Sequence, residues 1–272
     1  MRRRVLLYTG LVAAAAALLL PFYWMTVSSL KRSNDVFTIP IRWWPDTVVW
    51  QNYLDIWQKS DMTGWLRNTL FLSVMVTFFQ VLTGSFAAYG FSKVRFPGRE
   101  VLFILVLLTL MIPDQLRLVP IFVMFTNWHL LGHYHGYVLI KLASAAQLFL
   151  MRQYFLTIPR DLEEAAKLDG AGYFKTFWRV MLPLAGPAIA ALAILQFQGT
   201  WNDFFWPLIL FGQGSEHLYT MQLGLAQLTL TYQTLWPQLM AGSLIAIAPI
   251  LLIFLVFQRF FVSGVTAAGI KG

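Results

Sequence analysis

Long uncharged stretches of apolar residues alternate with short charged segments along the chain. The stretches predict membrane-spanning helices, because about 20 apolar residues in a helix cross a bilayer. We expect about six spans, over 5–30, 68–92, 101–125, 136–156, 184–210 and 239–261. The sequence "MIPDQLR" interrupts the third range, which leaves its boundaries the least sharply defined. The pattern predicts an all-α integral membrane protein with one transmembrane domain over 1–272.

The first stretch follows three arginines and contains Pro21. A basic start followed by small and apolar residues is also typical of a cleaved signal peptide. However, no charge occurs over the 26 residues from Val5 to Leu30. Because that length exceeds the apolar region of a signal peptide, we interpret the stretch as an uncleaved span kinked at Pro21.

Composition supports the membrane class. Of the 272 residues, 58% are hydrophobic and 12% are charged, whereas a soluble domain carries about 25% charged residues. The net charge of +8 could suggest nucleic acid, but in a membrane protein a basic excess usually lies in cytoplasmic loops, so we expect a lipid bilayer and no nucleic acid as partner. The chain has no cysteine, which excludes disulfides, cysteine metal sites and a thiol nucleophile.

The distribution of lysine and arginine predicts the orientation of the spans, since cytoplasmic loops carry the excess. With both termini in the cytoplasm, 13 of the 20 basic residues fall on the inner side. Lys31 and Arg32 fall on the outer side directly after the first span, against the rule. We expect a multi-pass protein of the cell membrane with both termini and the segment 158–183 in the cytoplasm.

The segment 158–183 concentrates charge in an otherwise apolar chain. Asp161 and Glu164 have the spacing of a capping box, with Asp161 as the N-cap. They predict a short helix over 162–169, and Gly170 supplies a left-handed stop. A second helix over 173–182, ended by Pro183, would complete a cytoplasmic helix-turn-helix.

The second helix of this segment carries an apolar face. Phe174, Phe177, Trp178 and Met181 have helical spacing, and the small side chains of Ala165 and Ala166 would let another protein approach. The segment is therefore interpreted as a docking element. Two alternatives remain: Glu164 only caps its helix, and the aromatic face only lies on lipid headgroups.

The same residues carry a family resemblance. Glu164-Ala165-Ala166, three residues, Gly170, nine residues and Val180-Met181-Leu182-Pro183 resemble the EAA motif of ABC importer permeases, with Val180 in place of isoleucine. The resemblance extends to the carbohydrate-uptake branch, the maltose permease branch, through the sequences "NYLDIW", "NTL", "AAYGFSKVRFPGR", "MRQYFLTIP", "WNDFFWPL" and "QRFFVSGVTAAGIKG". It covers the chain from about Pro21 to Gly272.

The resemblance implies a function and a set of partners. The chain would form half of a pathway for a sugar or oligosaccharide, beside a second permease subunit that is a different chain. Two ATPase subunits would bind ATP and magnesium, and an extracytoplasmic binding protein would deliver the substrate. Glu164 would pair with a basic residue of an ATPase subunit, and the outer loop 212–219 would contact the binding protein. The residues implied in ATPase coupling are Glu164, Ala165, Ala166, Asp169, Gly170, Phe174 and Phe177, with Gly269, Ile270, Lys271 and Gly272 as a C-terminal contact.

Polar residues inside apolar stretches are candidates for the substrate path. The fifth stretch contains Gln196, Asn202 and Asp203, and tryptophans nearby could stack on a sugar ring. Asp114 and Gln115 lie in the broken third stretch, and interrupted helices often line a cavity. The alternative is that the tryptophans mark a membrane interface and that Asp203 lies at the outer surface.

Other functions have weaker support. The chain contains no G-x-x-x-x-G-K-[ST] phosphate loop, so we expect a non-enzyme without a cofactor of its own. His129, His133 and His135 lack the further ligands of a metal site. A secondary transporter would need midplane charges and related halves, and a membrane enzyme would need an acid–base cluster or nucleophile.

Glycerol 3-phosphate or a polyol remains the alternative substrate of an importer. Arg117 is the one intramembrane arginine that could face a phosphate.

Overall fold

The computed structural model describes residues 2–212, 214–230 and 235–269, and these form helices and loops with no strand. Three helices are long: α1 (Arg2–Ser29), α3 (Met62–Lys93) and α14 (Trp236–Gly269). The predicted all-α fold class is confirmed. The shorter α-helices are α2 (Gln51–Lys59), α4 (Arg99–Leu108), α5 (Asp114–Asn127), α6 (Tyr134–Ile140), α7 (Ala145–Thr157), α8 (Asp161–Leu168), α9 (Tyr173–Thr176), α10 (Leu182–Leu184), α11 (Gly186–Trp201), α12 (Phe205–Phe211) and α13 (Met221–Leu230).

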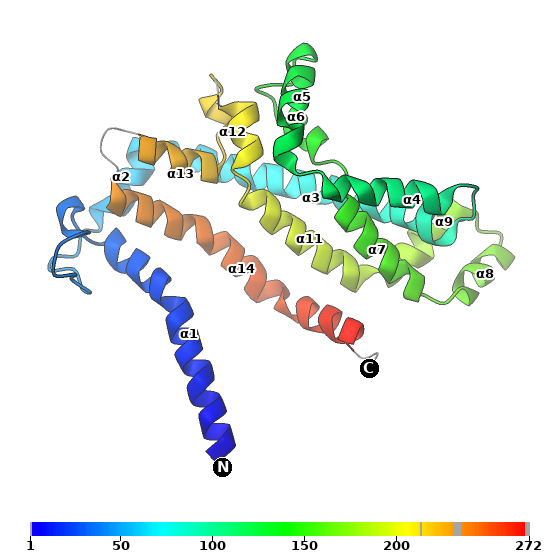
Figure 1. The fold of residues 1–272 in the computed structure, drawn as a ribbon, viewed down its shortest axis with the longest axis horizontal. Helices are drawn as coiled ribbons and strands as arrows, with labels where there is room; N and C mark the ends of the chain where they lie inside the picture. Colours follow the sequence, from blue (N-terminus) through cyan, green and yellow to red (C-terminus); the bar gives the residue numbers. More distant parts are fainter. Residues whose placement is uncertain (1, 213, 231–234, 270–272) are drawn as a thin grey trace.

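Helix α3 is the axis of the fold (Figure 1). It packs against α7 and α11 along its length, while α14 packs against α1, α2 and α11. Helix α1 extends away from the bundle (Figure 1), and its apolar residues are largely exposed. Because apolar surface of this extent is unfavourable in water, α1 is suited to lipid or to another membrane helix.

Helix length and hydropathy identify α1, α3 and α14 as candidate membrane spans among the described residues. Two bent pairs also qualify: α4 with α5, bent by 99°, and the helical segment 173–184 with α11, bent by 78°. The helices at the predicted second and sixth spans, α3 and α14, extend beyond the predicted ranges. Helix α3 begins at Met62, where Asp61 Oδ1 accepts a hydrogen bond from the Gly64 amide (3.0 Å). Helix α14 runs to Gly269.

The predicted fourth span, 136–156, is not one helix. It is divided between α6 and α7, and side chains of α3 bind the carbonyls that the division releases. Gln80 donates to the Lys141 carbonyl (2.9 Å) and Thr83 donates to the Leu142 carbonyl (2.6 Å). Backbone inside a membrane must find such partners, so α3 stabilises the break.

The predicted fifth span, 184–210, is also interrupted. Helix α11 ends at Trp201, and α12 begins after Asp203, whose Oδ1 accepts a hydrogen bond from the Trp206 amide (3.3 Å). The predicted third span breaks where expected, at Ile112 and Pro113. Helices α2 and α13 were not predicted, because both are short and lie between the apolar stretches.

Lys31 departs from the predicted charge distribution because its side chain is buried. The ammonium donates to the Arg42 carbonyl and lies 4.4 Å from the centre of the Trp24 ring. Burial lowers the pKa of Lys31. The Lys31 ammonium therefore makes contacts within the fold, whereas the lysine and arginine rule concerns basic residues of the loops that face the cytoplasm.

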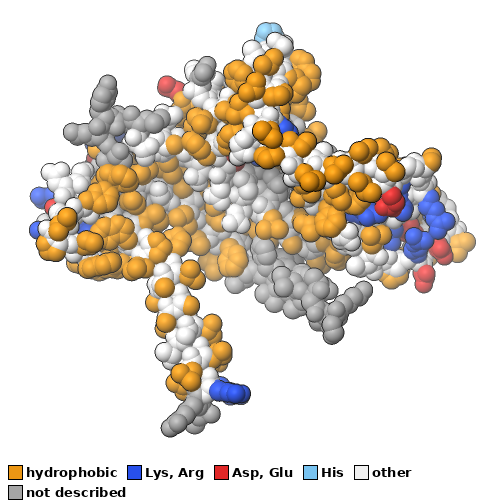
Figure 2. All heavy atoms as spheres, in the orientation of Figure 1, with side chains coloured by type: hydrophobic (Ala, Val, Ile, Leu, Met, Phe, Trp, Pro, Cys, Tyr) orange, Lys and Arg blue, Asp and Glu red, His pale blue; other side chains and the backbone are white. Residues whose placement is uncertain are grey.

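Charged side chains gather at the end of the bundle that carries α8 (Figure 2). The C-terminal ends of α3 and α7 and the N-terminal end of α4 meet there. Arg152 of α7 binds both carboxylate oxygens of Glu100 at 3.0 Å, and Lys93 of α3 donates to the Ile158 carbonyl (2.7 Å). These contacts fix the base from which α8 projects.

Candidate functional site

Helix α8 ends in a Schellman motif. Gly170 has a φ of 74°, and its amide donates to the Lys167 carbonyl (3.0 Å), while the Ala171 amide donates to the Ala166 carbonyl (2.9 Å). The predicted left-handed stop at Gly170 is confirmed. This turn reverses the chain between α8 and α9 and sets the angle of the helix-turn-helix.

Replacing Gly170 with alanine is expected to destabilise this turn by about 1–2 kcal/mol, because a side chain is unfavourable at a left-handed φ. No atom lies within 4 Å of the added methyl group, so the effect comes from the backbone alone. Hydrogen exchange of the α8 amides measures it. Gly172→Ala is the matched control, since Gly172 has a φ of −72° and equally open surroundings; equal exchange in both variants would contradict the prediction.

The start of α8 differs from the prediction. Arg160 is the N-cap, and Asp161 is the first helical residue and makes no capping hydrogen bond. The helix starts one residue early because the amides of Glu163 and Glu164 both donate to the Arg160 carbonyl. Glu164 does not cap the helix either: its side chain is exposed and makes no hydrogen bond or ion pair within the described chain. The capping interpretation of Glu164 is therefore wrong.

The second helix of the loop contains a π-helical turn at Phe177–Met181. The Leu182 amide donates to the Phe177 carbonyl five residues earlier, which widens the turn immediately before Pro183. Proline has no amide hydrogen and crowds the carbonyl four residues before it, and a wider turn relieves this crowding. The helical path consequently continues to Leu184 and bends at Ala185, whereas the sequence predicted an end at Pro183.

The aromatic face of this helix is divided between core and surface. Phe177 and Met181 are fully buried against Ala88, Tyr89 and Phe155. Phe174 is 65% exposed and Trp178 is also exposed. Phe177 therefore anchors the loop to α3 and α7, and its side chain is not available to a partner.

We call five exposed residues of the loop, one carboxylate and four small or apolar side chains, the loop surface. It consists of Glu164, Ala165, Leu168, Phe174 and Trp178, all of which are exposed. Leu168 is 90% exposed beside the Gly170 turn. Ala166 is buried beneath it, whereas Asp169 is exposed at the end of α8. Exposed apolar side chains in one short segment, of which Phe174 and Trp178 are in contact, are typical of an interaction surface.

A buried ion pair below the loop surface was missed by the sequence analysis. Lys93 Nζ lies 3.5 Å from Glu163 Oε1, and the two side chains are 3% and 7% exposed. Lys93 is the last residue of α3, and Glu163 lies in the first turn of α8. The sequence shows both charges but not their contact, because 70 positions separate them.

The predicted substrate-path residues come together only in part. Asp203 accepts a hydrogen bond from the Tyr137 hydroxyl (2.9 Å) and pairs with Lys141 Nζ at 2.8 Å. Trp206 links the fifth stretch to the third, because its indole donates to Asp114 Oδ2 (3.4 Å). Asp203 and Asp114 therefore belong to one polar network, in which the contributions of Tyr137 and Lys141 were not predicted.

The other candidates lie outside this network. Gln196 donates to Thr200 Oγ1 (3.0 Å), and Asn202 accepts from Gln222 (3.4 Å). Gln115 is exposed. Asp114 also pairs with Arg117, so the guanidinium considered for a phosphate is already bound to a carboxylate.

Two further predictions concern metal binding and the C-terminus. The described part of the chain contains no group of three or more histidine, aspartate or glutamate side chains that could hold a metal. Gly269 is the last residue of α14, whereas Ile270, Lys271 and Gly272 lie outside the described residues.

Residues 80–267 match the family model of the binding-protein-dependent transport system inner membrane component. The arabinooligosaccharides transport system permease protein AraQ of Bacillus subtilis is 35% identical, over 93% of this chain and 91% of the relative. The sn-glycerol-3-phosphate transport system permease protein UgpE of Yersinia pestis is 33% identical, over 93% and 92%. A crystal structure of a bacterial ABC transporter for import of the polysaccharide alginate contains a chain of the same fold, with a TM-score of 0.81 at 24% identity and coverage of 94% and 95%.

These matches confirm the resemblance to transport permeases and the location in a membrane. The match over 80–267 includes the loop 158–183 and the network around Asp203. The chain belongs to the family of inner membrane components of binding-protein-dependent transport systems.

Proposed function

We propose that this chain is a permease subunit of an ABC importer that takes up a sugar or oligosaccharide, and that it couples uptake to ATP hydrolysis by a separate subunit. The observation that carries this proposal is the loop surface. It presents Glu164 unpaired on α8, in the same loop as exposed apolar side chains. Glu163 of α8 pairs with Lys93 of α3, and Phe177 packs the following helix against α3. A carboxylate in this setting suits a basic residue of a partner protein.

The proposed assembly contains a second permease chain, two ATPase subunits that bind ATP and magnesium, and an extracytoplasmic binding protein. The end of the bundle with α8 would face the cytoplasm together with both chain termini. The concentration of basic residues at that end supports this orientation. The loop 212–219 is the proposed contact with the binding protein, and Gly269–Gly272 is a proposed second contact with the ATPase.

The relatives support the substrate class. AraQ is named for arabinooligosaccharides, and the network of Asp203, Tyr137 and Trp206 combines hydrogen-bonding groups with aromatic faces. Glycerol 3-phosphate is the second candidate, because UgpE is similar over nearly the same length. The pairing of Arg117 with Asp114 favours a neutral sugar.

Replacing Glu164 with glutamine or alanine is expected to reduce substrate-stimulated ATPase activity of the purified complex. The reduction should be at least about tenfold, because a charge pair buried by docking loses one partner. The control is Asp161→Asn, which removes an exposed carboxylate from the same helical turn. ATPase activity is measured with binding protein and a panel of sugars that includes arabinooligosaccharides and glycerol 3-phosphate.

The two Glu164 variants should retain the folded permease while the ATPase subunits dissociate or lose stimulation. If both variants assemble and couple as well as Asp161→Asn, the coupling role of Glu164 is wrong. Stimulation by glycerol 3-phosphate but by none of the sugars would replace the proposed substrate with the second candidate.

A further inference from the structure

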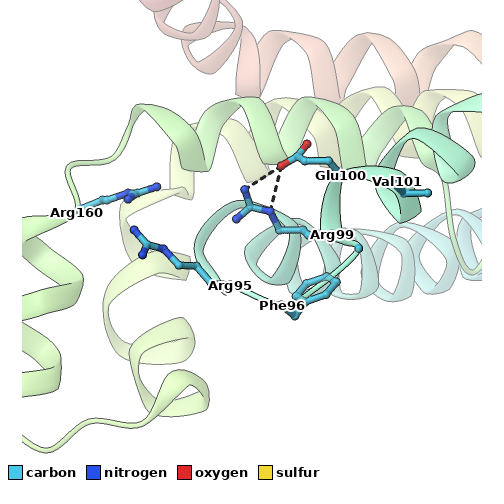
Figure 3. Close-up of a pocket in the computed structure, with 7 residues that line it drawn as sticks. Arg95, Phe96, Arg99, Glu100, Val101 and Arg160 are labelled. Atoms are coloured by element: carbon cyan, nitrogen blue, oxygen red, sulfur yellow. Dashed lines mark hydrogen bonds and ion pairs between the residues drawn. The ribbon is translucent and has the colours of Figure 1, made fainter.

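Three arginines meet in a pocket at the α8 end of the bundle. The pocket has a volume of about 450 Å³ and is lined by Arg95, Phe96, Arg99, Glu100, Val101 and Arg160. Arg95 lies in the loop between α3 and α4, and Arg160 precedes α8. Figure 3 shows their side chains converging from these two segments. The fold thus brings together like charges that are far apart in the sequence.

The charge of this pocket is not balanced by its own residues. Glu100 is its one lining carboxylate among the described residues, and Glu100 already binds Arg99 (2.8 Å) and Arg152 (3.0 Å). The side chains of Arg95 and Arg160 form no hydrogen bond or ion pair within the described chain. Two converging guanidinium groups repel each other, and an anion between them would remove this repulsion.

Phosphate is the anion that this arrangement fits best. A guanidinium presents its donors in a planar fork that binds phosphate oxygens in pairs. Gly98, the N-cap of α4, lines the pocket together with the first turn of the helix, and it provides no capping side chain. The backbone amides of this turn would add to the attraction of an anion that the arginines hold.

An apolar surface continues from the pocket along α4. Val101 and Phe96 are exposed at its edge, and Leu102, Leu105 and Leu108 are exposed farther along the helix. Figure 2 shows hydrophobic side chains over this region next to the cluster of lysine and arginine. Helix α4 begins one of the candidate membrane spans, so hydrocarbon chains would lie alongside it.

We propose that this pocket binds an anionic phospholipid. The headgroup phosphate lies between Arg95 and Arg160, and the acyl chains follow the exposed leucines of α4. Basic pockets at the cytoplasmic end of membrane helices bind such headgroups through the same chemistry. The proposal requires that α4 enters the membrane, but it does not depend on the transported substrate or on the docking of an ATPase.

Native mass spectrometry of the purified complex tests the proposal with phosphatidylglycerol and phosphatidylcholine as probes. The wild-type complex should retain phosphatidylglycerol at least about tenfold more strongly, since each basic residue at the surface adds to the attraction. The double substitution Arg95→Gln with Arg160→Gln should abolish this preference. Arg95→Lys with Arg160→Lys should keep part of it, because the charge remains without the planar fork.

The matched control is Arg32→Gln with Arg67→Gln. It removes two exposed arginines from the opposite end of the fold and should leave the preference unchanged. Equal retention of both lipids by the wild type, or an unchanged preference in the Arg95/Arg160 glutamine variant, would overturn the proposal. If inorganic phosphate displaces phosphatidylglycerol at equal concentration, the pocket binds free phosphate and the lipid assignment is wrong. Sugar-stimulated ATPase activity of the same variant is a separate readout, so failure here is distinguishable from failure of the proposed function.

Discussion

Replacing Lys93 with methionine is expected to lower the stability of the folded permease by about 3–5 kcal/mol, because removal of one partner leaves a buried charge uncompensated. The carboxylate left behind belongs to Glu163, whose side chain is 7% exposed. The substitution also removes the hydrogen bond to the Ile158 carbonyl. The affected contacts join the end of α3 to α8, so ATPase coupling should weaken with stability. The apparent melting temperature of the purified complex measures the first effect.

A second substitution separates the charge effect from the loss of packing. Glu163→Gln combined with Lys93→Met removes both charges and should recover much of the lost stability, since an uncharged buried pair costs far less than an isolated ion. Lys175→Met is the control, because Lys175 is exposed on the same loop. Equal melting temperatures for Lys93→Met and Lys175→Met would show that the buried pair does not form.

Replacing Phe177 with alanine is expected to destabilise the protein by about 3–5 kcal/mol, the usual effect of truncating a buried aromatic side chain. Phe177 packs edge-on against Phe86 at 5.3 Å and contacts Tyr89 at 5.4 Å between ring centres. The cavity would open between α3 and the loop 158–183. Thermal unfolding and hydrogen exchange of the loop amides both report this loss.

Phe174→Ala is the natural comparison, because Phe174 lies three residues earlier and is mostly exposed. It should leave the melting temperature nearly unchanged and instead reduce ATPase coupling. The two substitutions are therefore expected to differ in stability: Phe177→Ala lowers the melting temperature, whereas Phe174→Ala reduces coupling at a nearly unchanged melting temperature. A large loss of stability in Phe174→Ala, or none in Phe177→Ala, would contradict the assignment of core and surface.

The features predicted correctly from sequence are those that local chemistry determines. Gly170 terminates α8 because only a residue without a side chain accepts that φ readily, and this depends on its neighbours in the chain. The helical spacing of Phe174 and Phe177 was also visible. Which of them is buried was not, because that choice depends on the position of α3. The capping prediction for Asp161 failed because the Arg160 carbonyl accepts the first helical hydrogen bonds.

The interruptions of the apolar stretches could not be predicted for the same reason: they depend on contacts between residues that are far apart in the sequence. Apolar composition predicted continuous helices over 136–156 and 184–210, and hydropathy contains no information about where the backbone can break. The break after α6 is stabilised by Gln80 and Thr83, which lie about 60 positions away in sequence. One local signal was available: Ser144 and Gln147 have capping-box spacing, and the Gln147 amide does donate to the Ser144 hydroxyl (3.3 Å).

The π-helical turn at Phe177–Met181 has a consequence for insertions and deletions. It holds one more residue than an α-helical turn would hold over the same path. Deleting a single residue there would restore ordinary winding and leave the residues on either side facing as they do now, because the wide turn absorbs that residue. A deletion in α9 would instead rotate everything before it by about 100°, the angle that each residue adds to a helix. Within the nine-residue interval between Gly170 and Val180, the wide turn is accordingly where the loss of one residue would disturb the helix-turn-helix least.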